Sequence, residues 1–233
     1  MPPIRAITSR PLGGPHPPVF ARQEIPITRN HLLSAGFVTA WIGVISVGQF
    51  WLLGYQTNPG QSAKAADWPV ESTLRPRDGH FTLVLFAHPH CPCTRASVEE
   101  LSWVMAHSRG KLDVYAVFVL PKGAPADWER TPLWDMVATI PGLQPVSDVG
   151  GVEASRFRVE TSGQTLLFDS LGALVCSGGI TAGRGHAGDN AGRRALVECL
   201  AGRMPDRREI PVFGCPLFGD DRCDRDGNRE CKP

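Results

Sequence analysis

Two histidines and two cysteines lie close together in the sequence HPHCPC, at His88, His90, Cys91 and Cys93. A cysteine thiolate is the nucleophile of thiol–disulfide exchange, and thiolates with imidazoles also bind Cu(I) and Zn(II). The same residues therefore suit either redox chemistry or a metal site. Adjacent ligands in a turn often point apart, so the sequence alone does not bring all four together. A histidine beside a thiol can also favour the thiolate by its charge.

The elements on either side of these residues favour a reactive thiol. Residues 81–86 (FTLVLF) form an apolar run that predicts a buried strand. A helix is expected after the cysteines, because Val98, Leu101 and Val104 fall on one of its faces. Cysteines in the first turn of a helix meet unpaired backbone N–H groups and the positive end of the helix dipole, which lower the pKa of a thiol.

The arrangement resembles the active-site region of the thioredoxin superfamily, especially its membrane-anchored bacterial thiol-redox branch (TlpA/RedB-like). In that branch a strand ending in Phe precedes a Cys-Pro-x-Cys-Arg-Ala motif and a helix. The residues that match without a gap are Cys91, Pro92, Arg95, Ala96, Glu100 and Leu101. The chain departs at the second cysteine, because Thr94 occupies its place and Cys93 lies one position earlier. The motif is therefore C-x-C.

The resemblance implies that Cys91 attacks a disulfide as a thiolate. A disulfide between cysteines two residues apart needs unfavourable backbone angles, so one with Cys93 should be strained and easily reduced. Either Cys93 or a more distant cysteine therefore resolves the mixed disulfide, and Cys215 is our candidate for the distant one. Cys215 lies in an apolar stretch, 213–217, that is expected to pack on the domain. The supporting residues are Pro92, Thr94, Arg95, which with the helix start would stabilise the thiolate, and Gln164.

Residues 161–172 resemble the second half of a thioredoxin fold, in which a cis-proline opens a strand beside the cysteines. Gln164 takes the place of that proline. A trans bond is expected there, because a cis bond before a residue other than proline costs ~3–4 kcal/mol. The resemblance implies an α/β thioredoxin-like fold, a central mixed sheet flanked by helices. It covers about residues 70–203, and we place the domain at 77–203.

The alternative to redox chemistry is metal handling, in which the site holds copper for delivery to an acceptor protein. The copper-binding residues would be His88, His90, Cys91 and Cys93. The redox interpretation requires no cofactor. A third hypothesis is a non-catalytic assembly factor whose fold only presents a surface. The glycine-rich loop 178–188 lacks the Gly-Lys-Ser/Thr end of a phosphate-binding loop and is interpreted as a structural connection.

Residues 32–55 carry no charge and predict a transmembrane anchor. At ~1.5 Å per residue, such a helix spans a hydrocarbon core of ~30 Å. The charged residues before it are Arg5, Arg10, Arg22, Glu24 and Arg29. The positive-inside rule therefore places the N-terminus in the cytoplasm and the domain in the periplasm of a bacterial inner membrane. A cleavable signal peptide competes, because Ala63-Lys64-Ala65 has the A-x-A form, but the apolar run exceeds the usual ~7–15 residues.

The remaining organisation follows from composition. Residues 1–31 are proline-rich and predict a disordered cytoplasmic arm, 56–76 a linker, and 204–233 a cysteine-containing tail. With 233 residues, 42% of them apolar, the chain can hold one globular domain and these additional segments. A net charge of +1 gives no reason to expect nucleic acid as a partner.

Seven cysteines leave at least one without an intramolecular partner. Cys176, in a predicted strand, and Cys199, on the apolar side of the last predicted helix, are expected to be inert buried thiols. Cys223 and Cys231 flank a turn-rich stretch of the tail. Which of these four and Cys215 form disulfides with one another stays open.

Together these patterns predict a membrane-anchored periplasmic thiol–disulfide oxidoreductase acting through Cys91 and Cys93. Its expected partners are the thiols of envelope proteins or a membrane electron donor. The inner membrane is reached through residues 32–55.

Overall fold

A computed structural model of the chain describes residues 29–63, 67–108 and 110–218. The predicted arm up to residue 28 lies outside the described residues, as do Cys223 and Cys231. The division of the chain into domains stays a prediction.

The first helix, α1, runs over Arg29–Thr57 and contains the whole uncharged stretch. Its 29 residues, at ~1.5 Å each, exceed the ~30 Å of a hydrocarbon core. None of them is buried. In the part of the chain that the structure describes, α1 is the one helix long and apolar enough to cross a membrane. It also extends into the segment predicted as a linker, because Gln56 and Thr57 continue the helix.

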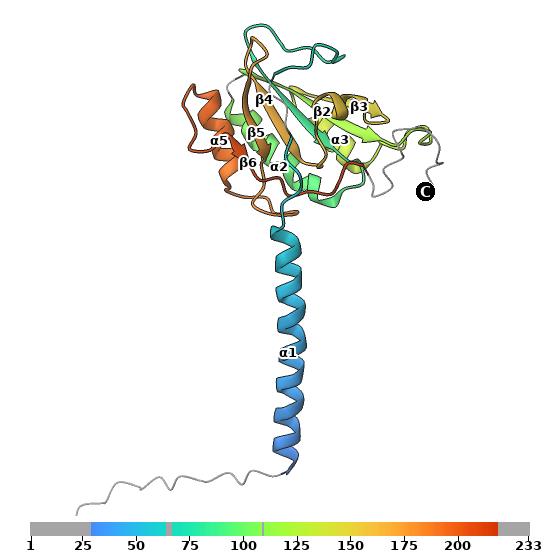
Figure 1. The fold of residues 1–233 in the computed structure, drawn as a ribbon, viewed down its shortest axis with the longest axis vertical. Helices are drawn as coiled ribbons and strands as arrows, with labels where there is room; N and C mark the ends of the chain where they lie inside the picture. Colours follow the sequence, from blue (N-terminus) through green and yellow to red (C-terminus); the bar gives the residue numbers. More distant parts are fainter. Residues whose placement is uncertain (1–28, 64–66, 109, 219–233) are drawn as a thin grey trace, which may run out of the picture. The chain divides into compact units, whose positions relative to one another are not determined.

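A six-stranded mixed sheet forms the centre of the folded part, in the order β3-β2-β1-β4-β5-β6 (Figure 1). Strands β1, β2 and β3 are parallel, β4 is antiparallel to both of its neighbours, and β6 is parallel to β5. The strands are β1 (Phe81–Ala87), β2 (Leu112–Leu120), β3 (Leu143–Val149), β4 (Gln164–Phe168), β5 (Leu174–Gly179) and β6 (Glu209–Ile210). The apolar run at 81–86 is therefore the buried strand that the sequence predicts.

The sheet is covered on both faces, because alternate residues of a strand point to opposite sides. Leu83 and Leu85 of β1 pack into a core cluster with apolar residues of three helices, whereas Val84 and Phe86 pack into a second cluster on the other face. The first cluster is covered by α2 (Pro92–His107), α3 (Pro132–Thr139) and α5 (Ala191–Leu200), and α4 (Val152–Arg156) contributes to the second.

This topology is that of a thioredoxin-like fold. A parallel unit, β1–α2–β2, precedes an antiparallel hairpin, β4–β5, that leads into α5. The two units meet where β1 pairs with β4. Strands β3 and β6 extend the sheet at its two edges. The fold class predicted from the sequence is thus confirmed.

The beginning of the C-terminal tail packs on the domain beside the start of β4. The Ser162 N–H donates to the Cys215 carbonyl and the Leu217 N–H donates to the Glu160 carbonyl, both at 2.8 Å. Gly214 lies so close to the Ser162 carbonyl that no Cβ fits there. The Leu217 side chain is 5% exposed in the second core cluster. The pairing therefore fixes Cys215 at one position on the domain.

We expect Leu217→Ala to lower the free energy of unfolding by about 2 kcal/mol, because it empties a buried position that anchors the tail. Leu171→Ala is the matched control: that side chain is 91% exposed in a turn, so a change below about 0.5 kcal/mol is expected. Urea denaturation of the full chain in detergent, followed by near-ultraviolet circular dichroism, measures both. Equal midpoints for the two variants would contradict a packed tail.

Candidate active site

Cys91 lies at the junction between the first strand and the helix that follows it. Its backbone has extended angles (φ −82°, ψ 112°) and forms the N-cap of α2, and Pro92 occupies the first helical turn. Proline suits this position, because its fixed φ matches a helix and its missing N–H would have no partner there. The Cys91 side chain is only 5% exposed. The sequence-predicted strand-to-helix placement of this cysteine is therefore what the structure has.

Three sulfur atoms meet at this junction, those of Cys91, Cys93 and Cys215. All three lie within 4.8 Å of one another, and all three residues are reduced thiols. Cys91 is buried, and the other two are half-buried. Cys93 comes from the first turn of α2, whereas Cys215 comes from the tail through its pairing with Ser162. We call these three residues the thiol cluster.

Hydrogen bonds make Cys91 the most acidic member of the thiol cluster. Burial alone raises the pKa of Cys91, but donors around the sulfur reverse that effect, and its pKa lies below the ordinary value. The donors are the hydroxyl and backbone N–H of Thr94 and the backbone N–H and thiol of Cys215. Each favours the thiolate, because a hydrogen bond to the charged form stabilises it.

The other two thiols hold their protons more tightly. Burial and the neighbouring Cys91 thiolate raise the pKa of Cys93. Burial and the hydrogen bond with Cys91 raise the pKa of Cys215 to about 12. A second negative charge next to the first is unfavourable. The first proton that the reduced thiol cluster loses therefore comes from Cys91, and the other two thiols stay neutral when it does.

A short chain of hydroxyl groups aims the Thr94 donor at Cys91. The His88 N–H donates to the Ser162 Oγ at 2.8 Å, and the Ser162 and Thr94 hydroxyl oxygens lie 2.7 Å apart. Because the Thr94 hydroxyl gives its proton to the Cys91 sulfur, the Ser162 hydroxyl must donate to Thr94. Both side chains are buried. The sequence marks Thr94 as a supporting residue but gives no sign of Ser162, which arrives from a distant segment.

The positive charge at the site comes from Arg184, in the glycine-rich loop 178–188. Its guanidinium donates to the Gly214 carbonyl, next to Cys215, and its charge opposes the rise in the pKa of Cys93 and Cys215. The resemblance suggested Arg95 for this role. Arg95 instead lies exposed on α2, where its Nε is 3.1 Å from the Glu99 Oε1. No local spacing in the sequence connects the loop arginine with the thiols, which is why sequence reasoning missed it.

The two histidines of the motif contact Trp128 instead of joining the thiol cluster. The rings of His88 and His90 lie 5.5 Å and 4.5 Å from the Trp128 ring, centroid to centroid. The His90 Nε2 is also 3.2 Å from the Trp128 carbonyl oxygen. Burial, and then the charge of His90, lower the pKa of His88. Neither imidazole has a nitrogen in the group of ligand atoms that meets at the thiols.

Gln164 opens β4 with a trans peptide bond, as expected, since the described residues contain no cis bond. Its side chain is fully buried. The side-chain Oε1 accepts a hydrogen bond from the Ala63 N–H at 3.2 Å, and the Nε2 donates to the Thr165 carbonyl at 3.3 Å. Gln164 therefore holds the segment after α1 against the domain.

Two further cysteines, Cys176 on β5 and Cys199 on α5, are buried in the first core cluster. A hydrogen bond with Cys199, followed by burial, strongly raises the pKa of Cys176. Accepting that bond lowers the pKa of Cys199 despite its burial. Both side chains are at most 3% exposed, so the two thiols are buried as the sequence predicts.

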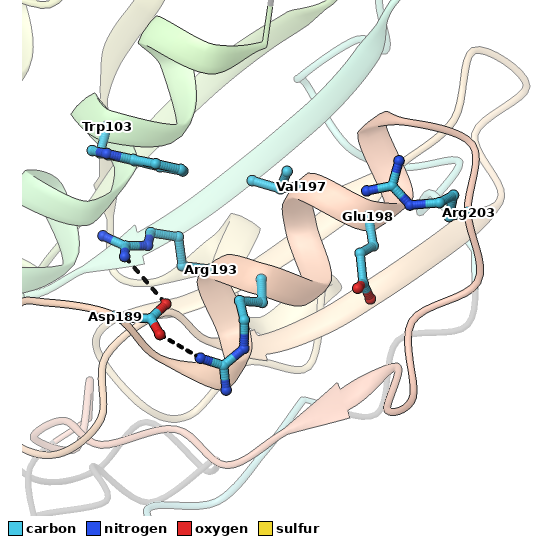
Figure 2. Close-up of a pocket in the computed structure, with 7 residues that line it drawn as sticks. Trp103, Asp189, Arg193, Val197, Glu198 and Arg203 are labelled. Atoms are coloured by element: carbon cyan, nitrogen blue, oxygen red, sulfur yellow. Dashed lines mark hydrogen bonds and ion pairs between the residues drawn. The ribbon is translucent and has the colours of Figure 1, made fainter.

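An open pocket of about 350 Å³ lies between α2 and α5 (Figure 2), and no cysteine is among the residues that line it. Three of its charged groups are paired, because Asp189 contacts both Arg193 and Arg194, at 3.3 and 2.7 Å. Arg193 also pairs with the buried Glu100 at 2.9 Å and stacks over Trp103 at 4.3 Å. These contacts join two helices. The thiol cluster is the stronger candidate for chemistry.

No protein-family model matches the chain, and no curated protein matches it. Solved structures do. A hypothetical protein from Sinorhizobium meliloti shares 18% identity over 68% of this chain and 97% of its own, with a TM-score of 0.52. An uncharacterized conserved protein from Geobacillus kaustophilus shares 16% identity over 69% of this chain and 92% of its own, with a TM-score of 0.49. A secreted disulfide oxidoreductase from Mycobacterium tuberculosis shares 17% identity over 54% of this chain and 83% of its own, with a TM-score of 0.39. At such identities the likeness concerns the fold alone.

We expect Thr94→Val to raise the pKa of Cys91 by about one to two units. A hydrogen bond to a charged group contributes about 1.5–3 kcal/mol, and one pKa unit corresponds to about 1.4 kcal/mol. The rate of Cys91 alkylation by iodoacetamide, followed by mass spectrometry as a function of pH, measures the pKa. The wild-type midpoint should lie below the ordinary value of a cysteine thiol.

The control for this substitution is Thr139→Val, which removes an exposed hydroxyl from the end of α3. It should leave the pH profile of Cys91 alkylation unchanged. A Thr94→Val profile that coincides with that of the control would show that the hydroxyl does not stabilise the thiolate.

Proposed function

We propose that this protein is a membrane-anchored thiol–disulfide oxidoreductase of the bacterial envelope, a TlpA/RedB-like member of the thioredoxin superfamily with a C-x-C motif. One observation carries the proposal: the Cys91 sulfur lies at the start of α2 beside other thiols, with hydrogen bonds that lower its pKa. Thiol–disulfide exchange requires a thiolate near neutral pH and a second thiol within reach.

In the first step, the Cys91 thiolate attacks one sulfur of a disulfide in a client protein. A new S–S bond joins Cys91 to the client, the client's own S–S bond breaks, and its second sulfur leaves as a thiolate. The leaving sulfur takes a proton from water. Once Cys91 is part of the mixed disulfide, no thiolate remains beside Cys215 to raise its pKa, and the Cys215 thiol loses its proton to water.

In the second step, the resulting Cys215 thiolate attacks the Cys91 sulfur of the mixed disulfide. The Cys91–client bond breaks, and the client's remaining sulfur leaves and takes a proton from water. The client now holds two thiols, and the protein holds a Cys91–Cys215 disulfide. Two electrons have passed to the client, and the same steps in reverse oxidise a client dithiol.

Cys215 fits the resolving role better than Cys93, although both sulfurs lie within 4.8 Å of the Cys91 sulfur. Only Pro92 separates Cys93 from Cys91, and its ring restricts the backbone, so a disulfide over that interval is strained. Cys215 approaches from a separate segment without this restriction. Its N–H and thiol already contact the Cys91 sulfur.

The proposed location follows from α1 and the arginines before it: N-terminus in the cytoplasm, single pass through the inner membrane, and domain in the periplasm. The periplasm lacks the reducing thiol pool of the cytosol. Clients are therefore envelope proteins, and a membrane dithiol donor returns the two electrons when the protein acts as a reductant.

We expect Cys215→Ser to abolish the internal disulfide and Cys93→Ser to preserve it. The full chain in detergent is equilibrated in glutathione redox buffers, quenched with acid, alkylated and mapped by mass spectrometry. Wild type and Cys93→Ser should show a reversible Cys91–Cys215 disulfide, because the same two sulfurs remain. Cys215→Ser should instead accumulate glutathione on Cys91, since nothing resolves the mixed disulfide.

Cys93→Ser is also the matched control, because it makes the same substitution in the same thiol cluster. A Cys91–Cys93 disulfide in the wild type would contradict the assignment of the resolving cysteine. If Cys91 stayed a thiol in every buffer, the proposed oxidoreductase activity itself would be wrong.

A further inference from the structure

The sulfur positions of the thiol cluster are close to those that a three-coordinate metal ion requires. With metal–sulfur bonds of about 2.3 Å, a trigonal site places its three sulfurs about 4.0 Å apart. The sulfurs of Cys91, Cys93 and Cys215 are all within 4.8 Å of one another. Small side-chain rotations would close the difference, and the half-buried Cys93 and Cys215 have room to make them.

We propose that the reduced protein binds one Cu(I) ion through Cys91, Cys93 and Cys215. Soft thiolates select Cu(I) or Zn(II) among the biological metals. Structural zinc sites have four protein ligands, whereas Cu(I) accepts three. Among the residues that the structure describes, no histidine, aspartate or glutamate joins these three sulfurs as a fourth ligand.

The ligand set differs from the one that the sequence motif suggests. His90 is hydrogen-bonded to Trp128 and packed against its ring, and His88 packs against the same tryptophan. The third ligand comes from the tail, where the Ser162–Cys215 hydrogen bond delivers it to the motif. Two ligands are thus local in sequence and the third depends on the fold.

The surroundings suit a cluster that gains negative charge when it binds the ion. Metal binding requires thiolates, so the ligand thiols lose their protons to solvent as the ion enters. Three thiolates and one Cu(I) carry a net charge of −2. The Arg184 guanidinium, bonded to the Gly214 carbonyl, acts electrostatically on both Cys93 and Cys215 and opposes this charge.

Copper binding does not depend on the exchange reaction, although the two use the same sulfurs. A Cys91–Cys215 disulfide removes two of the three ligands, so only the reduced protein should hold the ion. The two activities are therefore mutually exclusive in one molecule at one time, and each can be measured without the other.

The test titrates the reduced full chain in detergent with Cu(I) under anaerobic conditions, in competition with a chromophoric Cu(I) chelator. One equivalent should bind, and X-ray absorption spectroscopy should show three sulfur ligands at about 2.3 Å and no nitrogen. Cys93→Ser and Cys215→Ser should each lower the affinity by roughly 100-fold or more, since losing an outer-shell partner alone costs about 10–100-fold.

His90→Ala is the matched control and should bind Cu(I) as the wild type does. Near-ultraviolet circular dichroism of each variant verifies that it is folded. The proposal is overturned if the reduced wild type binds no Cu(I), if the absorption spectrum contains nitrogen ligands, or if His90→Ala weakens binding while Cys215→Ser does not. The proposal is also overturned if the protein binds Zn(II) through four ligands and Cu(I) does not displace that ion. None of these results bears on the disulfide map, so the oxidoreductase proposal stands or falls separately.

Discussion

The hydrogen bond from the Ser162 N–H to the Cys215 carbonyl holds the candidate site together. Through this bond the tail is fixed beside the start of β4, and Cys215 reaches the Cys91 sulfur. The same serine uses its hydroxyl to orient Thr94, the side-chain donor to Cys91. A single residue thus controls both the position of the distant thiol and the acidity of the attacking one. The contact is specific, because only glycine fits at position 214 against the Ser162 carbonyl.

Burial and hydrogen bonding act in opposite directions on the thiol cluster, and their balance differs between its members. Removing a thiolate from water disfavours it, which raises the pKa of Cys93 and Cys215. At Cys91 several donors outweigh that cost, because each hydrogen bond to a charged group contributes about 1.5–3 kcal/mol. The first proton is therefore lost from Cys91, and the other two thiols retain theirs. This division requires a buried site, since water would supply equal donors to all three.

The sequence predicts the parts of the site that are local in the chain. The apolar run at 81–86 and the helical spacing after it place Cys91 at the strand-to-helix junction, where the structure has it. It could not predict Ser162 or Arg184, because their contacts with the site depend on how the β4–β5 half and its following loop pack on the β1–α2 half. The histidines illustrate the converse. Their proximity to the cysteines in sequence suggested a shared site. In the structure both imidazole rings instead pack against Trp128, from the segment between β2 and α3.

The presence of three thiols where two would serve is explained by the combination of the two proposals. In the proposed exchange, Cys91 attacks and Cys215, from the tail, resolves the mixed disulfide. Cys93 then has no part in the exchange, yet its sulfur lies within 4.8 Å of both partners. The charge of the Cys91 thiolate raises the pKa of Cys93, so a second thiolate beside the first is unfavourable. A soft cation removes this repulsion between thiolates, because its positive charge compensates the negative charges of the thiolates that bind it. Metal binding therefore gives the third sulfur a purpose that disulfide chemistry does not.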